Sequence, residues 1–187
     1  MAEDYGTLWY VLSFWAVGIA QQPLLVGVSL PLCSVHIRTK ESPIFSDANM
    51  VYANYALFAL CVSAILTAES ADTSLQKFMV ENKVRVQKGQ NKIPILREGL
   101  WKYSRHPNYF GNSLMWWGIY LVCCNAKNGW KTIYSPVLMT YLLTNVSGAK
   151  LLERTLKRTK PGFAEYVKSV PEFVPWKLLR SKFSLLS

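Results

Sequence analysis

Apolar residues occur along this 187-residue chain in long blocks, rather than at the alternating or helically spaced positions of a water-soluble fold. Three blocks, at residues 50–67, 109–124 and 133–149, contain no Lys, Arg, Asp or Glu. Each approaches the roughly 20 residues that an α-helix needs to cross ~30 Å of hydrocarbon. We therefore predict a transmembrane helix in each of these blocks.

A fourth apolar block covers residues 7–35 and carries Gln21, Gln22 and Pro23 in its middle. It is too long for one perpendicular helix, so it forms either one long kinked span or two half-spans, and we favour the kinked span. Its acidic leading stretch, "MAEDYG", is unlike a secretory signal or a mitochondrial presequence. The expected fold is all-α: a polytopic integral membrane protein with about four transmembrane helices plus interfacial amphipathic helices, in a single membrane domain at residues 1–187.

The connection at residues 69–108 is too long and too polar to be a simple link between two spans. Leu75, Phe78 and Met79 are spaced to share one face of a helix, so we expect the second span to continue and then lie along the interface. Pro94 and Gly99 predict a helix-free stretch after it, extended or hooked back towards the membrane.

The tail at residues 150–187 is predicted to be a basic amphipathic segment. Leu151, Leu152 and Leu156 give its first helix an apolar side, and Pro161 and Gly162 end that helix.

The net charge of +10 is distributed unevenly, because 17 of the 21 Lys and Arg residues lie in residues 70–108 and 150–182. Four spans would place both segments on the same side of the membrane. The positive-inside rule assigns that side to the cytoplasm or to an equivalent such as the mitochondrial matrix. We expect membrane lipids as partners, no nucleic acid, and a location in the mitochondrial inner membrane or the endoplasmic reticulum.

Four cysteines lie in apolar runs without metal-ligand spacing: Cys33, Cys61, Cys123 and Cys124. They are expected to be buried, reduced, small hydrophobic residues, and we predict no metal site.

Polar side chains cluster at the start of the third predicted span, in the motif "RHPNY" at residues 105–109. One interpretation is an interfacial anchor, with Tyr109 in an aromatic belt and Arg105 reaching lipid phosphates. The other is an anion site, because the positive helix end that Pro107 begins lies beside Arg105 and His106. Gly111 would let another backbone or a ligand approach closely.

The stretch "GLWKYSRHPNYFG", followed by "WWG" and "SGAKLLERTLKRTKPGFAEYVKSVPEFVPW", resembles the C-terminal half of the membrane reductase family related to steroid 5-alpha-reductases. More distantly, it is similar to sterol reductases and isoprenylcysteine carboxyl methyltransferases. The resemblance covers residues 3–176. It implies an NADPH cofactor and a set of residues that would face it: Asp72, Arg105, His106, Asn108, Tyr109 and Tyr166. All of these except Asp72 are expected to converge into one polar pocket near the basic interface.

Two departures from the family pattern bear on activity. The family's usual acidic residue after the glycine is Asn112 here. By this resemblance, "AEDYGTLWY" corresponds to the end of the family's front spans, so we expect the proton-donating pair that those spans carry to be missing. No catalytic residue is therefore identified. Glu69 and Asp72 are the nearest candidates for an acid, against the simpler interpretation that both lie at a solvated helix end.

Three functions remain open. We favour a non-catalytic accessory subunit that packs against other membrane protein subunits in a larger assembly. The alternative is an NADPH-dependent reductase of a double bond in a steroid or other lipid enone, an oxidoreductase acting on a CH-CH bond. The second alternative is an S-adenosylmethionine-dependent lipid methyltransferase.

Overall fold

The computed structural model describes residues 26–29, 32, 48–125, 128–146 and 149–175. This part of the chain is helical and contains no β-strand, which confirms the all-α prediction. Most of the apolar block at residues 7–35, His36, Cys33 and the end of the basic tail lie outside the described residues. The interpretation of the first block as one kinked span therefore stays a prediction. Of the described cysteines, Cys123 is buried, whereas Cys124 is exposed, so the expected burial is wrong there.

Helix α2 (Ala48–Gln87) is the longest element, with 40 residues. At ~1.5 Å per residue it is about 60 Å long, because its sequence contains neither Gly nor Pro to interrupt it. The predicted span at residues 50–67 forms its first half. By length and composition, its residues Val51–Gln87 form the single described helix that is long and apolar enough to cross a membrane. Four spans stay a prediction.

The second half of α2 differs from our expectation for Glu69 and Asp72. Both residues lie within the continuous helix rather than at a helix end. Glu69 is exposed, whereas Asp72 is half-buried. A solvated helix end therefore describes neither residue.

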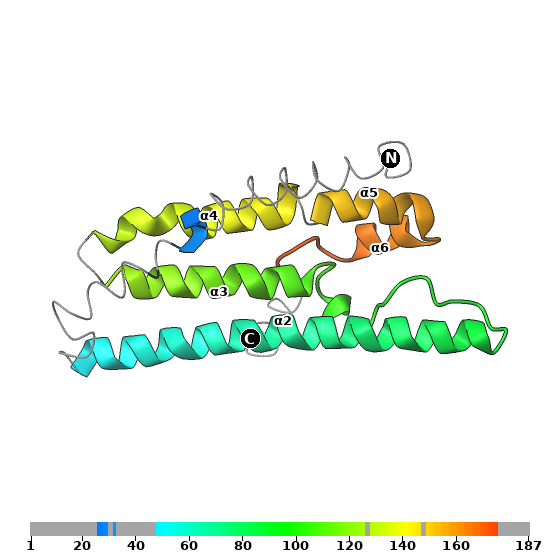
Figure 1. The fold of residues 1–187 in the computed structure, drawn as a ribbon, viewed down its shortest axis with the longest axis horizontal. Coiled ribbons are helices and arrows are strands. Elements are labelled where there is room, and N and C mark those ends of the chain that lie inside the picture. The colour runs from blue at the N-terminus through cyan, green and yellow to red at the C-terminus, as the bar shows by residue number, and fades with distance from the viewer. Residues whose placement is uncertain (1–25, 30–31, 33–47, 126–127, 147–148, 176–187) are drawn as a thin grey trace, which may run out of the picture.

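Helix α3 (Pro107–Cys123) runs antiparallel to α2 and lies between α2 and α4 (Figure 1). Small side chains allow its close approach to α2, where Ala64 and Ala71 are fully buried. A Cβ atom on Gly111 would lie 2.7 Å from the backbone oxygen of Ala64 and 2.8 Å from the backbone nitrogen of Ala68. The close approach expected at Gly111 is thus that of the neighbouring helix backbone.

Replacing Gly111 with leucine should therefore separate α2 from α3. We expect the variant to lose about 1–3 kcal/mol of stability, the usual range for overpacking a filled interior, because backbone atoms of α2 cannot move aside. Thermal unfolding of the purified protein in detergent measures the loss. Ser63→Leu is the matched control, since Ser63 is exposed on α2 next to the contact; equal losses for both variants would contradict this packing.

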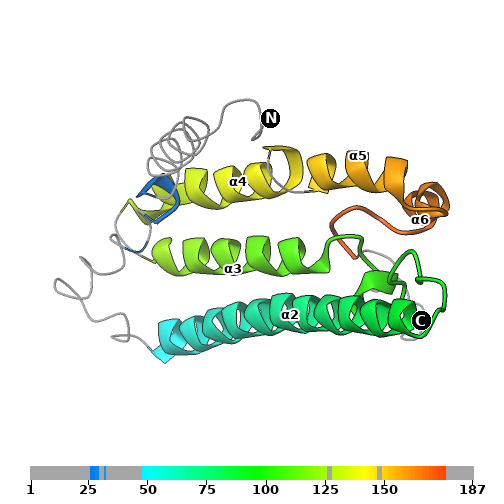
Figure 2. The ribbon, with the colours of Figure 1, turned by 45° about the vertical axis from the view of Figure 1, so that its right-hand side comes forward.

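The third layer begins with the 3-10 helix η2 (Gly129–Ile133) and α4 (Tyr134–Tyr141), and continues through the π-helical turn η3 (Leu142–Val146) into α5 (Ala149–Thr159). Figure 2 shows the same order of layers from a second direction. The predicted span at residues 133–149 is thus built from several short helical pieces. Thr140 joins this layer to α3, because its hydroxyl lies 2.7 Å from that of Ser113 and accepts a 3.2 Å hydrogen bond from Trp117 Nε1.

A small cluster of side chains closes one end of the bundle. Helix α6 (Phe163–Ser169) follows α5 after a turn at Gly162, whose φ of 75° favours glycine. Phe163, Tyr166 and Val170 are buried there. Leu156 of α5 packs against this cluster, whereas Leu152 is exposed, so the apolar side predicted for α5 only partly faces the interior.

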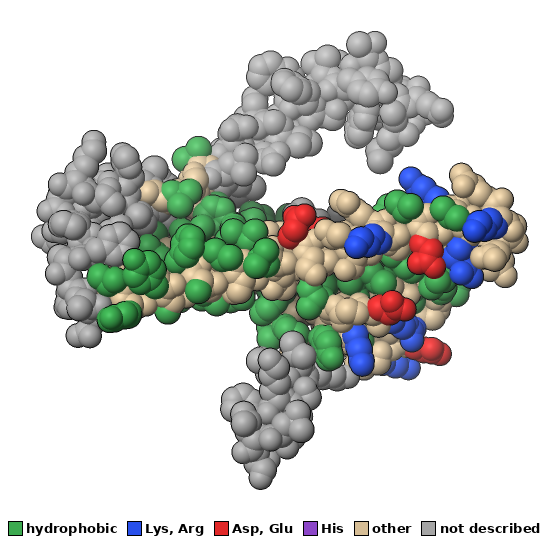
Figure 3. Space-filling model, turned by 90° about the horizontal axis from the view of Figure 1, so that it is seen from below, with side chains coloured by type: hydrophobic (Ala, Val, Ile, Leu, Met, Phe, Trp, Pro, Cys, Tyr) green, Lys and Arg blue, Asp and Glu red, His purple; other side chains and the backbone are tan. Residues whose placement is uncertain are grey.

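The segment that links α2 to α3 also lies at this end. Residues 90–98 have no regular structure and lead into the 3-10 helix η1 (Gly99–Lys102), as Pro94 and Gly99 predict. Figure 3 shows charged side chains gathered at this end of the molecule and apolar side chains over the rest of the same face. The apolar side chains exposed on the first half of α2 include Tyr52, Tyr55, Phe58, Ile65 and Leu66.

Candidate functional site

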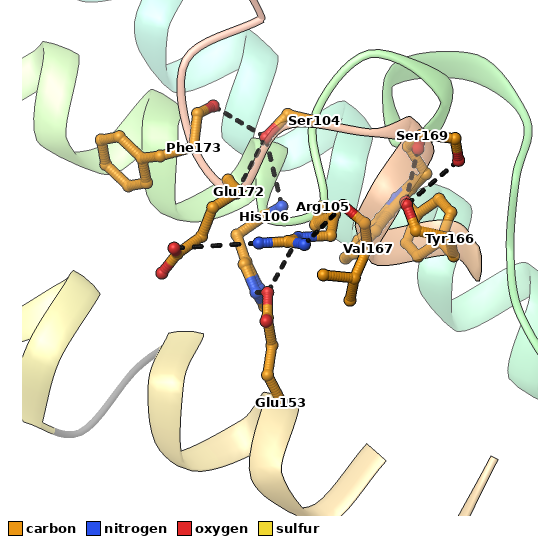
Figure 4. A network of polar contacts seen from close by, with 10 residues as sticks. Ser104, Arg105, His106, Glu153, Tyr166, Val167, Ser169, Glu172 and Phe173 are labelled. Carbon is orange, nitrogen blue, oxygen red and sulfur yellow. Dashed lines mark hydrogen bonds and ion pairs between the residues drawn. The ribbon is translucent and has the colours of Figure 1, made fainter. Parts of the chain in front are cut away.

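The start of α3 is fastened to the segment that follows α6. Ser104 Oγ donates a 2.8 Å hydrogen bond to the backbone oxygen of Phe173 and accepts one of 3.2 Å from the backbone nitrogen of His106. The backbone nitrogen of Arg105 donates to the oxygen of Pro171 at 3.0 Å. These bonds, with Pro107 at the first helical position, fix where Arg105 and His106 enter the interior (Figure 4).

Arg105 is buried and bound on several sides. Its Nε lies 2.9 Å from Glu153 Oε1, and its Nη2 lies 3.8 Å from Glu172 Oε2. Nη1 donates a 3.1 Å hydrogen bond to the backbone oxygen of Val167. A single guanidinium thereby joins the segment before α3 to α5, α6 and the segment after α6.

His106 shares the same carboxylate. Its Nε2 lies 3.0 Å from Glu153 Oε1, and its ring stacks on Tyr109 with the centroids 5.4 Å apart. Burial lowers the pKa of His106 and outweighs the opposing effect of the hydrogen bond to Glu153. The imidazole is therefore neutral near pH 7, with Nε2 protonated and donating to Glu153.

This lowered pKa predicts a loss of stability in mild acid. The unfolded chain binds a proton at His106 near pH ~6.5, whereas the folded chain binds it only at lower pH. The contribution of the neutral His106 to the free energy of unfolding is therefore fully present above ~6.5 and falls as the pH drops below that value. Unfolding midpoints measured between pH 7 and 5 should decline less steeply in His106→Gln than in the unmodified protein. Parallel slopes for the two proteins would contradict the neutral, buried histidine.

Glu153 and Glu172 complete the site, and the sequence analysis did not find them. Glu153 is the one acidic residue of α5 and falls in helical register with Ala149 and Leu156, which also face the interior. An acidic residue on the inward side of an otherwise basic helix is the signal that could have indicated it. Glu172 follows Pro171 in the segment after α6 and carries no comparable signal.

Asp72 and Asn108 form a separate contact between α2 and α3. Asn108 Nδ2 donates a 2.8 Å hydrogen bond to Asp72 Oδ1. Asn108 Oδ1 is buried and has no hydrogen-bond partner among the described residues. Of the two candidate acids, Asp72 thus holds an α3 side chain in place, whereas Glu69 is exposed.

Tyr166 lies on the side of α6 that faces η1. Its hydroxyl donates a 2.5 Å hydrogen bond to the backbone oxygen of Trp101, and the Trp101 indole donates in turn to the backbone oxygen of Ala71 at 3.1 Å. Burial raises the pKa of Tyr166 to about 12, although Arg105 and Arg97 act in the opposite direction. The hydroxyl therefore remains a hydrogen-bond donor over the whole physiological range.

The six predicted residues consequently form three neighbouring groups. Arg105 and His106 meet at Glu153, and Tyr109 stacks on His106. Asn108 pairs with Asp72. Tyr166 borders a different cavity from Arg105. The groups are linked through α6, because Arg105 binds the carbonyl of Val167, the residue after Tyr166.

Two cavities lie beside these residues, and their linings indicate which chemical group each could hold. One of about 270 Å³ is lined by Arg105, Lys150, Glu153, Arg154, Lys157, Val167 and Glu172. The other, of about 390 Å³, includes Tyr166 in its lining. The cations of the first cavity fit a phosphate group.

Comparison with known proteins places the chain in one family. A family model described as "Protein of unknown function (DUF1295)" matches residues 1–170, so the chain belongs to this family. Neither a curated protein nor a solved structure matches it.

Proposed function

We propose that this member of the DUF1295 family is a multi-span membrane protein that performs no catalysis itself and acts as an accessory subunit of a larger membrane assembly. In this proposal the reductase-like residues hold helices together. The proposed location is the mitochondrial inner membrane or the endoplasmic reticulum, with the charged end of the bundle on the cytoplasmic or matrix side.

The distribution of side chains supports the membrane arrangement. α3 contains no charged residue over its 17 positions, and large apolar side chains of α2 are exposed, Phe58 by 67% and Leu66 by 62%. Exposed apolar area of this kind is favourable in lipid or against another apolar helix, and costly in water. The basic residues concentrate beyond this region, as expected at a headgroup layer.

The structural role rests on one observation, the ion pairs of Arg105. Its guanidinium and the His106 ring both contact Glu153 inside the protein, at 2.9 and 3.0 Å. A cofactor phosphate that took Arg105 as its partner would leave the buried carboxylate of Glu153 without its strongest ion pair, which is energetically costly. Asn112 adds to this argument, because a neutral side chain stands where the resemblance leads us to expect a carboxylate.

Cofactor turnover tests the proposal. We expect the purified chain to show no substrate-dependent NADPH oxidation with steroid or lipid enones, and Asn112→Glu not to restore it. The measurement is loss of NADPH absorbance, with an active membrane reductase as the positive control. Substrate-dependent oxidation by this chain would refute the accessory role. Purification from native membranes in mild detergent should in addition retain other membrane subunits in fixed proportion.

The second candidate is an NADPH-dependent reductase of a lipid double bond, which the cavity beside Arg105 favours. Lys150, Arg154 and Lys157 project from successive turns of α5 into that cavity, and a phosphate there could form charge-assisted hydrogen bonds. NADPH would supply the hydride, and these residues would hold its phosphate. Saturable NADPH binding that Lys157→Gln weakens and Lys168→Gln does not would favour this candidate.

A further inference from the structure

The cavity of about 390 Å³ lies between the segment before η1, η1 itself and the end of α6. Its lining consists of Arg97, Lys102, Tyr103, Tyr166, Ser169 and Val170. Two of these residues are cations and none is acidic. Its electrostatic character therefore differs from that of the cavity beside Arg105, which contains Glu153 and Glu172.

The two cations of this cavity retain most of their binding capacity. Arg97 Nη2 donates to the backbone oxygen of Gly162 at 3.1 Å, and the guanidinium lies 5.6 Å from the centroid of the Tyr166 ring. That contact uses one of five N–H donors. Lys102 Nζ lies 5.7 Å from the centroid of the Tyr103 ring. Within the described part of the chain, neither cation forms an ion pair, in contrast to Arg105.

We propose that this cavity binds a phosphate monoester. A guanidinium presents paired donors that match two phosphate oxygens, and an ammonium group adds a further charge-assisted bond. The tyrosine rings and Val170 form apolar walls that suit the carbon skeleton next to the phosphate. A single negative charge would satisfy only one of the two unpaired cations, so a dianionic group fits better than a carboxylate.

Two sources share this chemistry: phosphatidic acid in the membrane, and a soluble phosphate. The cavity belongs to the charged end of the bundle, which lies at the headgroup layer in the arrangement proposed above. The lipid source therefore rests on that arrangement, whereas phosphate binding itself does not, and neither requires catalysis.

Binding to the full chain in detergent micelles tests the proposal. The probes are short-chain phosphatidic acid, short-chain phosphatidylcholine and inorganic phosphate, each titrated while intrinsic tryptophan fluorescence is recorded. We expect phosphatidic acid or inorganic phosphate to bind at least about tenfold more tightly than phosphatidylcholine, and Lys102→Gln to weaken that binding about tenfold, which corresponds to the loss of one charge-assisted bond. Arg97→Lys should also weaken it, because a lysine cannot replace the paired donors.

Lys92→Gln is the matched control, since Lys92 is an exposed cation in the same loop outside the cavity lining. Tighter binding of phosphatidic acid than of inorganic phosphate assigns the lipid source, and the reverse order assigns the soluble one. No preference over phosphatidylcholine, or equal losses in Lys92→Gln and Lys102→Gln, would overturn the proposal. These results are independent of NADPH turnover, so failure of this proposal and failure of the accessory role are distinguishable.

Discussion

Replacing Glu153 with leucine should destabilise the protein by about 3–5 kcal/mol, the range found when one partner of a buried ion pair is removed. The variant leaves the Arg105 guanidinium buried, at 8% side-chain exposure, without its closest carboxylate. It also removes the acceptor of His106 Nε2. Thermal or chemical unfolding of the purified protein in detergent measures the effect.

A double variant separates the loss of the pair from the loss of packing. Arg105→Met combined with Glu153→Leu removes both charges, so it should recover a large part of the stability lost in Glu153→Leu. Glu165→Leu is the matched control, because Glu165 is exposed on α6 and should tolerate the change within about 0.5 kcal/mol. If the double variant were less stable than Glu153→Leu alone, the ion pair could not be the source of the loss.

Replacing Trp101 with alanine should cost a comparable amount, about 3–5 kcal/mol, as expected for truncating a large aromatic side chain in the interior. Trp101 is 9% exposed, and its indole nitrogen donates to the backbone of α2 at Ala71. Its side chain therefore fixes η1 against α2, and its carbonyl receives the Tyr166 hydroxyl. The loss is measured as a lower unfolding temperature.

Trp130→Ala is the control for this prediction, because Trp130 is 62% exposed on η2. Trp101→Phe keeps most of the apolar area and removes only the N–H donor, so its loss should be the smaller of the two Trp101 variants. Equal unfolding temperatures for Trp101→Ala and Trp130→Ala would show that η1 is not held by this side chain.

The sequence by itself determined the helical class and the identity of the polar cluster at the start of α3. Long charge-free apolar blocks exclude an alternating strand pattern. Proline is favoured at the first position of a helix, which is the position that Pro107 takes in α3. The sequence also predicted the end of α5 at Pro161 and Gly162, because backbone dihedral preferences are local. These features depend on neighbouring residues alone.

Only the tertiary structure decided which partners these residues have. Glu153 is 48 positions beyond Arg105 in the chain, so no local rule connects them, and one carboxylate can satisfy a cation only where folding brings the two within a few ångströms. The same holds for Asp72, which we expected at a helix end. In the structure α2 continues beyond Asp72 and places its carboxylate beside Asn108. Composition and periodicity specify which face of a helix is apolar. The pairing of buried polar groups depends on the distances between helices, and these distances are set only when the helices pack together.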